Sequence, residues 1–188
     1  MGGAAQHAGA VLLSLRHNTR MTQRLFFALW PDDPLREAIQ SRVPAGHGGR
    51  PVAPENLHLT LAFIGDADAA YAECLARAAS TVEMQPFEFE LTGLGCFRKP
   101  GVLWLGDVAP RAPLERLAQD LNAALTTCGF KPEAREYRPH VTVARKLKAP
   151  VARAPIHPIR WSVDRFCLVV SKPGPDGVRY EVVQRYPV

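Results

Sequence analysis

Apolar and polar residues change their spacing along the chain in a way that predicts alternating strands and helices. The run RLFFALW at residues 24–30 is continuously apolar, which is typical of a strand buried on both faces. A helix is expected next, because Asp32 and Asp33 can cap its N-terminus and its first turn accepts Pro34. The Gly- and Pro-rich segment 44–54 is predicted to be a loop.

A second strand and helix follow this loop. The strand LHLTLAFI, residues 57–64, ends at Gly65, and Asp68 can cap the helix after it. One side of this helix is apolar through Tyr71, Cys74, Leu75, Ala78, Ala79 and Val82. The first half of the chain therefore predicts the order strand, helix, strand, helix.

The second half is richer in strands. Residues 87–108 predict two strands joined by a loop that contains Pro100 and Gly101. A third helix is expected over about 111–128, with Gly129 as its stop. The remaining strands are predicted at 139–145, 161–171 and 178–186.

The predicted order, β-α-β-α-β-β-α-β-β-β, excludes a simple alternating parallel sheet and indicates the α+β class. Helix followed by strand recurs in both halves, so we expect a duplicated α/β unit with its halves facing each other across a cleft. A chain of 188 residues is long enough for one well-buried domain or two small lobes that share a core. We expect a single bilobal domain over residues 21–188.

Residues 1–20 differ in character from the rest. Their short apolar patch has no basic segment before it and no cleavage-site pattern after it, which argues against a signal peptide. We expect a disordered N-terminal extension. No run of 18 apolar residues occurs, so no transmembrane helix is predicted. We therefore expect a cytoplasmic protein without a membrane partner, and we expect it to be a monomer.

Charge and cysteine content limit the classes of ligand and site that the sequence supports. Of the formal net charge of +5, Arg16 and Arg20 contribute two, and the remaining +3 suits a phosphate-bearing ligand better than duplex nucleic acid. The cysteines show neither a C-x-x-C pair nor His at metal-ligand spacing. Disulfides remain open, but apolar surroundings favour four reduced, buried thiols, at Cys74, Cys96, Cys128 and Cys167.

Two short stretches repeat the order His, apolar, Thr, apolar: HLTL at residues 58–61 and HVTV at 140–143. On a strand, residues two apart share a face, so each stretch presents an imidazole and a hydroxyl together. Chance predicts about 0.26 H-x-T triplets, and about 0.06 when both flanking positions must be apolar. A third triplet, at His17, fails that requirement. The repeat therefore indicates a paired site.

Two imidazoles and two hydroxyls suit a reaction at a phosphodiester. Near pH 7 one His can accept a proton while the other donates one. The hydroxyls of Thr60 and Thr142 can hold the non-bridging oxygens, and the scheme requires no metal or other cofactor. A strained 2′,3′-cyclic phosphate is a natural substrate for such a site. A metal site built from His47, His58 and His157 has no ligand spacing in its favour.

The wider sequence resembles the bacterial and archaeal RNA 2′,3′-cyclic phosphodiesterases, also called 2′-5′ RNA ligases, of the two-histidine phosphoesterase superfamily. The matching phrases are RLFFALWPDDPLREAI, LHLTLAFIG, GCFRKPGVLWLG and YRPHVTVARK, and the similarity covers nearly all of residues 23–186. This resemblance implies a bilobal α+β fold with pseudo-two-fold symmetry, in which antiparallel sheets flank a central cleft lined by the two motifs.

The resemblance also implies a role for each motif residue. His58 would donate a proton to the leaving 3′ oxygen, and His140 would accept a proton from water. Thr60 and Thr142 would bind the phosphate, and the product would be a 2′-phosphomonoester. The expected partners are RNA ends or nucleotides with a 2′,3′-cyclic phosphate. An RNA 5′-hydroxyl in place of water would make the reversible reaction a 2′-5′ ligation.

Some interpretations stay open at the level of sequence. By strand alternation Arg145 points away from the His face unless the strand bends, so it is either a phosphate ligand or a surface charge. Phe63 and Phe97 either stack on a base or, as is more usual, pack in the core. The alternatives for the whole protein are a non-catalytic RNA- or nucleotide-binding module and a two-histidine enzyme for another cyclic phosphate or a 2′-5′-linked oligonucleotide. Intact His and Thr at both motifs favour catalysis.

Overall fold

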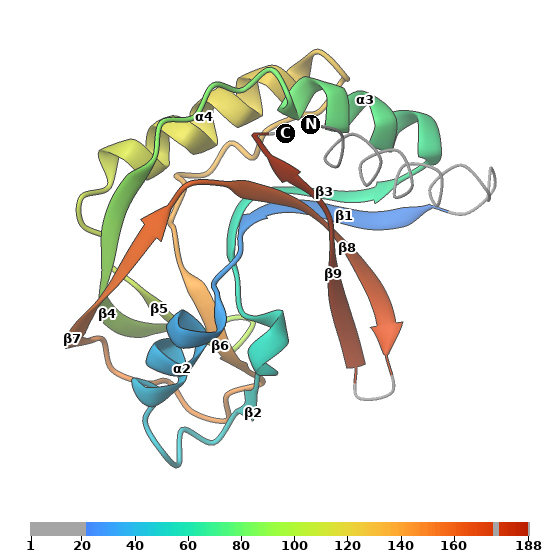
Figure 1. Cartoon of the computed structure of the whole chain (residues 1–188). Coiled ribbons are helices and arrows are strands. Elements are labelled where there is room, and N and C mark those ends of the chain that lie inside the picture. The colour runs from blue at the N-terminus through green and yellow to red at the C-terminus, as the bar shows by residue number, and fades with distance from the viewer. Residues whose placement is uncertain (1–21, 175–176, 188) are drawn as a thin grey trace.

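The computed structural model describes residues 22–174 and 177–187, and its strands form one antiparallel sheet in the order β7-β4-β5-β6-β3-β1-β8-β9, with β2 paired to β6 (Figure 1). The strands are β1 (Gln23–Leu29), β2 (Arg50–Pro51), β3 (Leu59–Ala67), β4 (Phe87–Phe97), β5 (Val102–Gly106), β6 (Val141–Arg145), β7 (Ala154–Val163), β8 (Phe166–Gly174) and β9 (Gly177–Tyr186). The helices are α2 (Asp33–Ser41), the 3-10 helix η1 (Pro54–Asn56), α3 (Ala69–Ala79) and α4 (Ala112–Thr126).

The two halves of the sheet meet where the motif strands meet. The register between β3 and β6 consists of one residue pair, Leu59 opposite Val141, and these are the second residues of the two motifs. On one side of this pair lie β3, β1, β8 and β9, and on the other β6, β5, β4 and β7. The α+β class is confirmed. The two motif strands are antiparallel neighbours through this one residue pair, at the junction of the two halves.

Side-chain caps begin two of the helices as the sequence predicts. The Asp32 carboxylate accepts a hydrogen bond of 3.0 Å from the Leu35 backbone N–H at the start of α2. Asp68 accepts one of 2.8 Å from the Tyr71 N–H at the start of α3. Such bonds satisfy N–H groups that have no partner within the helix. These two predicted caps are confirmed.

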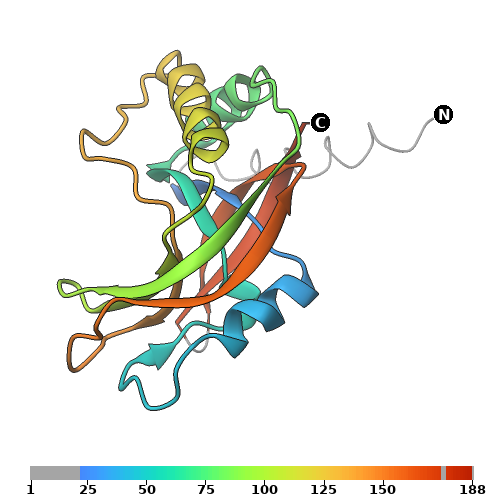
Figure 2. The same ribbon diagram turned by 90° about the vertical axis from the view of Figure 1, so that its left-hand side faces the viewer.

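The main core lies between the sheet and the pair of helices α3 and α4, which pack side by side across one face (Figures 1 and 2). β1 is buried on both faces, as its continuous apolar run predicts. Phe27 belongs to the main core, whereas its neighbours Phe26 and Ala28 belong to a second, smaller cluster with Cys167 and Val169. This smaller cluster forms part of the face that carries the functional groups.

The cysteine prediction is wrong for two residues. Cys74 on α3 and Cys128 just after α4 form a disulfide with a Cα–Cα distance of 5.9 Å, whereas Cys96 and Cys167 are free. The apolar spacing placed each paired cysteine on the inner side of its own helix. It contained no information that the two helices are neighbours.

One strand was missed and another was predicted too long. The predicted strand 161–171 is interrupted at Asp164 and Arg165, where β7 ends and β8 begins. No strand was predicted over the first residues of β7, which include Pro155 and Pro158. Proline is tolerated in β7 because this strand lies at the edge of the sheet, where not every N–H needs a partner strand.

No helix among the described residues is long and apolar enough to span a membrane. The proposed N-terminal extension, residues 1–20, lies outside the residues that the structure describes.

Candidate active site

The first motif strand contains a β-bulge directly after its motif Thr. Thr60 lies opposite Ala28 of β1, and Phe63 lies opposite Phe26, so three residue steps on β3 match two on β1. Residues directly opposite each other in an antiparallel pair share a face of the sheet. Phe63 therefore lies on the same face as Thr60. Its side chain is 44% exposed, so the default expectation that it packs in the core is wrong.

The second motif strand contains the matching bulge. Thr142 lies opposite Trp104 of β5, and Arg145 lies opposite Val102, so three steps on β6 again match two on the partner strand. Strict alternation would have turned Arg145 away from the motif face. The bulge instead returns Arg145 to the face of Thr142, which is the strand bend that sequence reasoning left open. Phe63 and Arg145 occupy equivalent positions in the two halves.

His58 stands just before β3 and is enclosed by aromatic rings. Its ring centroid lies 4.8 Å from that of Phe26, 5.1 Å from that of Tyr180 and 5.8 Å from that of Trp30, which is stacked on it. Its Nδ1 lies 2.7 Å from the backbone carbonyl oxygen of Asn56. A carbonyl only accepts, so Nδ1 carries a proton and Nε2 is the nitrogen left for chemistry.

His140 repeats this arrangement just before β6. Its Nδ1 lies 2.7 Å from the carbonyl oxygen of Arg138, again two residues earlier in the chain. The ring meets Phe97 edge to face, with centroids 5.0 Å apart. The two imidazoles are therefore held by the same local device in both halves, and each presents Nε2.

Both imidazoles are half-buried and have lowered pKa values. Burial is the largest cause for His58 and brings its pKa to about 4, against the hydrogen bond to the Asn56 carbonyl, which raises it. Burial is also the largest cause of the lowered pKa of His140. The positive charge of Arg145 lowers the pKa of both rings, so its guanidinium lies within electrostatic reach of both. Without a ligand, both rings are therefore mainly neutral at pH 7.

The sequence reasoning missed two residues that hold the segments around these rings. The Asn56 side chain donates a 2.7 Å hydrogen bond to the Val178 carbonyl and accepts one of 3.0 Å from the Tyr180 N–H, which ties β9 to the start of the first motif. Tyr137 donates its hydroxyl to the Thr60 carbonyl at 3.0 Å. Neither residue had a local sequence signal, because their partners lie 77 to 124 residues away along the chain.

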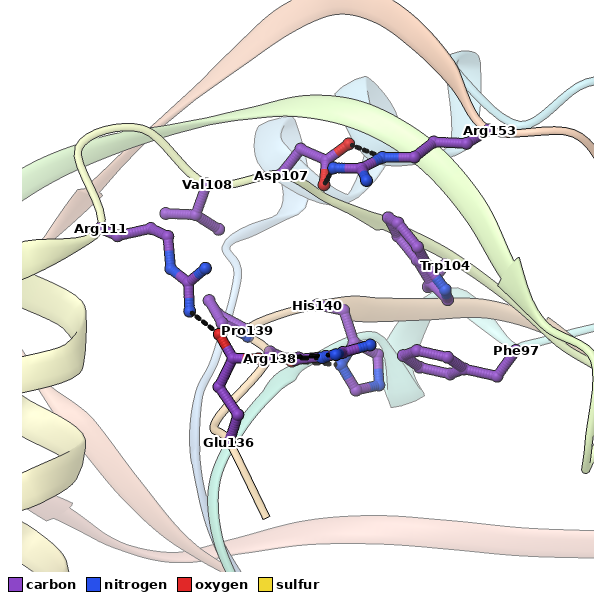
Figure 3. A pocket seen from close by; sticks show the side chains of 10 residues that line it. All are labelled: Phe97, Trp104, Asp107, Val108, Arg111, Glu136, Arg138, Pro139, His140 and Arg153. Atoms are coloured by element: carbon purple, nitrogen blue, oxygen red, sulfur yellow. Dashed lines mark hydrogen bonds and ion pairs between the residues drawn. The ribbon is translucent and has the colours of Figure 1, made fainter.

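A cavity of about 300 Å³ borders on one of the two imidazoles. His140, Phe97 and Trp104 form one wall, and the rest consists of three arginines, their carboxylate partners, Val108 and Pro139 (Figure 3). The other motif residues, His58, Thr60, Thr142 and Arg145, do not line it.

The two other histidines considered as metal ligands, His47 and His157, lie on different segments from His58. His157 lies on β7, and His47 bonds through Nδ1 to the Gly49 N–H in the loop before β2. Among the residues that the structure describes, no group of three or more His, Cys, Asp or Glu side chains is arranged to hold a metal ion.

Comparison with known protein families identifies the family of this chain. A family model described as the 2′-5′ RNA ligase superfamily matches residues 31–175, which is well over half of the chain. The chain belongs to the 2′-5′ RNA ligase superfamily.

Similar members of the 2′-5′ RNA ligase superfamily come from several organisms. The RNA 2′,3′-cyclic phosphodiesterase of Escherichia coli is 33% identical over 170 residues, which is 87% of this chain and 96% of the relative. The protein of the same name from Thermus thermophilus is 32% identical over 178 residues, covering 87% and 89% of the two chains.

A solved structure shows the same superfamily fold. The crystal structure of E. coli LigT complexed with 3′-AMP aligns with a TM-score of 0.79 at 32% identity, over 88% of this chain and 97% of that one. The similarity therefore includes both halves of the sheet and both motif strands.

Proposed function

We propose that this protein hydrolyses 2′,3′-cyclic phosphates of RNA ends or nucleotides to 2′-phosphomonoesters. The observation that carries the proposal is the matched pair of imidazoles, each fixed through Nδ1 to a backbone carbonyl two residues earlier and each followed by a Thr on the motif face. The relatives from E. coli and T. thermophilus are named RNA 2′,3′-cyclic phosphodiesterase, which supports the same substrate class.

The proposed chemistry is an in-line displacement at phosphorus. Nε2 of neutral His140 accepts a proton from water as the water oxygen bonds to phosphorus. The bond from phosphorus to the 3′ oxygen breaks, and Nε2 of protonated His58 supplies the proton to that oxygen. The phosphate remains on the 2′ oxygen. The two imidazoles carry out both proton transfers, so the scheme requires no metal ion.

The lowered pKa of His58 makes substrate binding part of this scheme. A proton donor has to be protonated, and the ring has a pKa of about 4 without ligand. A phosphodiester beside the ring brings a negative charge, which stabilises imidazolium and raises its pKa. Binding is therefore coupled to proton uptake, and the enzyme protonates its donor only when a substrate is in place.

Three further side chains complete the proposed phosphate site. The hydroxyls of Thr60 and Thr142 donate to non-bridging oxygens, and the guanidinium of Arg145 balances the negative charge that develops there. Arg145 takes this role because the bulge in β6 places it on the motif face. Phe63, the equivalent exposed residue of the other half, offers a flat surface for the base of the bound nucleotide.

The test is product analysis with the full chain in the presence of EDTA. A 2′,3′-cyclic mononucleotide and an RNA ending in a 2′,3′-cyclic phosphate are each incubated with the protein, and the 2′- and 3′-monophosphates are separated by chromatography. The proposal predicts 2′-phosphate as the product from both substrates. Binding without turnover would support a binding module instead, and a 3′-phosphate product would contradict the assigned geometry.

A further inference from the structure

The two imidazoles of the proposed function have different surroundings. Three aromatic rings enclose His58, whereas His140 makes a single ring contact, with Phe97, among the residues that the structure describes. Three arginines line the cavity beside His140, and His58 is not part of that cavity. Nearby positive charges favour a neutral imidazole, as a proton acceptor requires, whereas aromatic faces attract a positively charged one. The surroundings of each ring therefore match its proposed role.

Trp30 presents the face of its indole to His58. The two rings are stacked, with centroids 5.8 Å apart and planes 14° apart. A cation over an aromatic face within about 6 Å of the ring centroid is attracted by the quadrupole of the ring, and Trp is the strongest such partner. The indole therefore stabilises the protonated form of His58 more than the neutral form.

The other two rings around His58 are fixed by their own packing. Phe26 is tilted by 38° to the imidazole and belongs to the smaller core cluster, with 4% of its surface exposed. Tyr180 meets both the imidazole and Phe26 edge to face, and its backbone N–H donates to the Asn56 side chain. Trp30 directly follows β1 and is only partly buried against this cluster. Trp30 is therefore the ring whose replacement disturbs the core least.

The aromatic rings have two opposite effects on His58. Burial of the imidazole disfavours its charged form and is the largest cause of its pKa of about 4, so this effect dominates without ligand. A phosphodiester beside the ring brings a negative charge, and imidazolium then forms against the indole face. Stacking also limits rotation of the imidazole. Together with the Nδ1–H bond to the Asn56 carbonyl, it leaves Nε2 pointing in one direction.

We propose that Trp30 is a positioning residue for the proton donor, whose indole face stabilises the imidazolium form of His58 when an anionic substrate is bound. This role rests on the proposed function, in which His58 protonates the leaving 3′ oxygen. Trp30 itself exchanges no proton with the substrate. It acts through His58, by favouring the charge that the donor has to carry and by holding the ring that carries it.

The first experiment measures the charge on His58 directly. Its carbon-bound ring protons are titrated by NMR in the full chain, without ligand and with saturating sulfate. Sulfate is the anionic probe because its own charge is constant over the range of the titration. In the sulfate complex the pKa of His58 should be about one pH unit lower in Trp30→Leu than in the wild-type protein. Trp30→Phe keeps an aromatic face and should lie within about half a unit of wild type.

The second experiment measures turnover of a 2′,3′-cyclic nucleotide as a function of pH. A donor with a lower pKa loses its proton at a lower pH, so the alkaline limb of kcat should move down by about one unit in Trp30→Leu. Above that limb kcat should be about tenfold below wild type, and at acidic pH the two should be equal. KM should change less than about twofold, because Trp30 acts through His58.

Tyr71→Leu is the matched control for loss of a ring. Tyr71 lies on α3 and is partly buried against the main core, away from the smaller cluster that contacts His58. Its replacement should change neither the pKa of His58 nor the pH profile of kcat. Thermal unfolding shows whether each variant is folded. If Trp30→Leu does not fold, Trp30→Met, which also lacks a ring, is measured in its place.

The outcomes separate this role from the proposed function. A pKa of His58 in the ringless variant equal to or above that of wild type would overturn the role of Trp30. A loss of kcat by the same factor at every pH would also overturn it, because the effect would then be structural only. A raised KM with an unmoved alkaline limb would make Trp30 a substrate contact instead. Absence of hydrolysis in the wild-type protein would contradict the proposed function, whereas the NMR titration would still test the contact of Trp30 with His58.

Discussion

At the residue level, the chemistry of each motif histidine depends on which ring nitrogen is hydrogen-bonded to the backbone. His58 and His140 each donate an Nδ1–H hydrogen bond to a backbone carbonyl two residues earlier. Nε2 of each ring is therefore the nitrogen available for proton transfer. The sequence predicted the two histidines and threonines because the repeated spacing is local. It could not show the pKa of either ring, because burial and the charge of Arg145 come from distant segments.

The first prediction concerns the charge on these rings. Arg145→Gln should raise the pKa of His58 and of His140, because removing a nearby positive charge favours the protonated imidazole. NMR titration of the imidazole carbon-bound protons in ligand-free protein measures both values. Addition of inorganic phosphate to the wild-type protein should also raise them, because its negative charge favours imidazolium.

Arg77→Ala is the matched control for this titration, since Arg77 lies on α3 and pairs with Glu73. It should leave both imidazole pKa values unchanged. A wild-type His58 that titrates at or above its ordinary value near 6.5 would contradict the structure's account of its burial.

At the scale of elements, alternation predicted the motif faces correctly up to Thr60 and Thr142 and failed immediately beyond them. The bulges place two consecutive buried residues in each strand, Leu61-Ala62 and Val143-Ala144. These paired apolar residues after each motif Thr were a usable signal, because strict alternation would have made one of them polar. The matching bulges bring Phe63 and Arg145 to the motif face.

The second prediction concerns the link between η1 and β9. Asn56→Ala removes both hydrogen bonds to the backbone of β9 and should lower the free energy of unfolding by roughly 2 kcal/mol. It should also lower kcat/KM about tenfold, because Tyr180 and the carbonyl that orients His58 are held less precisely. Chemical denaturation and steady-state kinetics measure the two effects.

Asn122→Ala provides the comparison for this substitution. The Asn122 side chain donates a 2.7 Å hydrogen bond to the Ala118 carbonyl within α4. Its replacement should leave kcat/KM unchanged. If Asn56→Ala lost stability but kept full activity, its role would be structural only.

In the whole molecule, the order of strands in the sheet brings together segments that are far apart in the sequence. The α+β class followed from the order of elements, because local patterns are enough to establish it. The contact of β3 with β6 and the pairing of Cys74 with Cys128 were not predictable, because spacing along one element does not show which other element lies beside it. The helices linked by the disulfide pack on the core side of β3, whose other face carries Thr60.

The third prediction concerns this disulfide. Its cysteines are 54 residues apart, and closing a loop of that length stabilises a fold by roughly 4 kcal/mol through the unfolded chain. Reduction, or the double substitution Cys74→Ala and Cys128→Ala, should therefore lower the free energy of unfolding by up to that amount while hydrolysis continues at 25 °C. Equilibrium denaturation with and without reductant measures the difference.

Thiol counting checks the pairing directly. Alkylation of the denatured, unreduced protein should modify two cysteines, Cys96 and Cys167, and leave the other two unmodified. Alkylation of all four, with no effect of reductant on stability, would contradict the pairing.

The turnover of three variants measures whether the two matched imidazoles share the proton transfers of cyclic phosphate hydrolysis. With a saturating 2′,3′-cyclic nucleotide in EDTA, His58→Ala and His140→Ala should each lower kcat by roughly 10² or more, the usual contribution of a general acid or base. The double variant should lose much less than the product of the two effects, because the residues act as a unit. Full activity in either folded single variant would show that the substituted imidazole transfers no proton in the reaction.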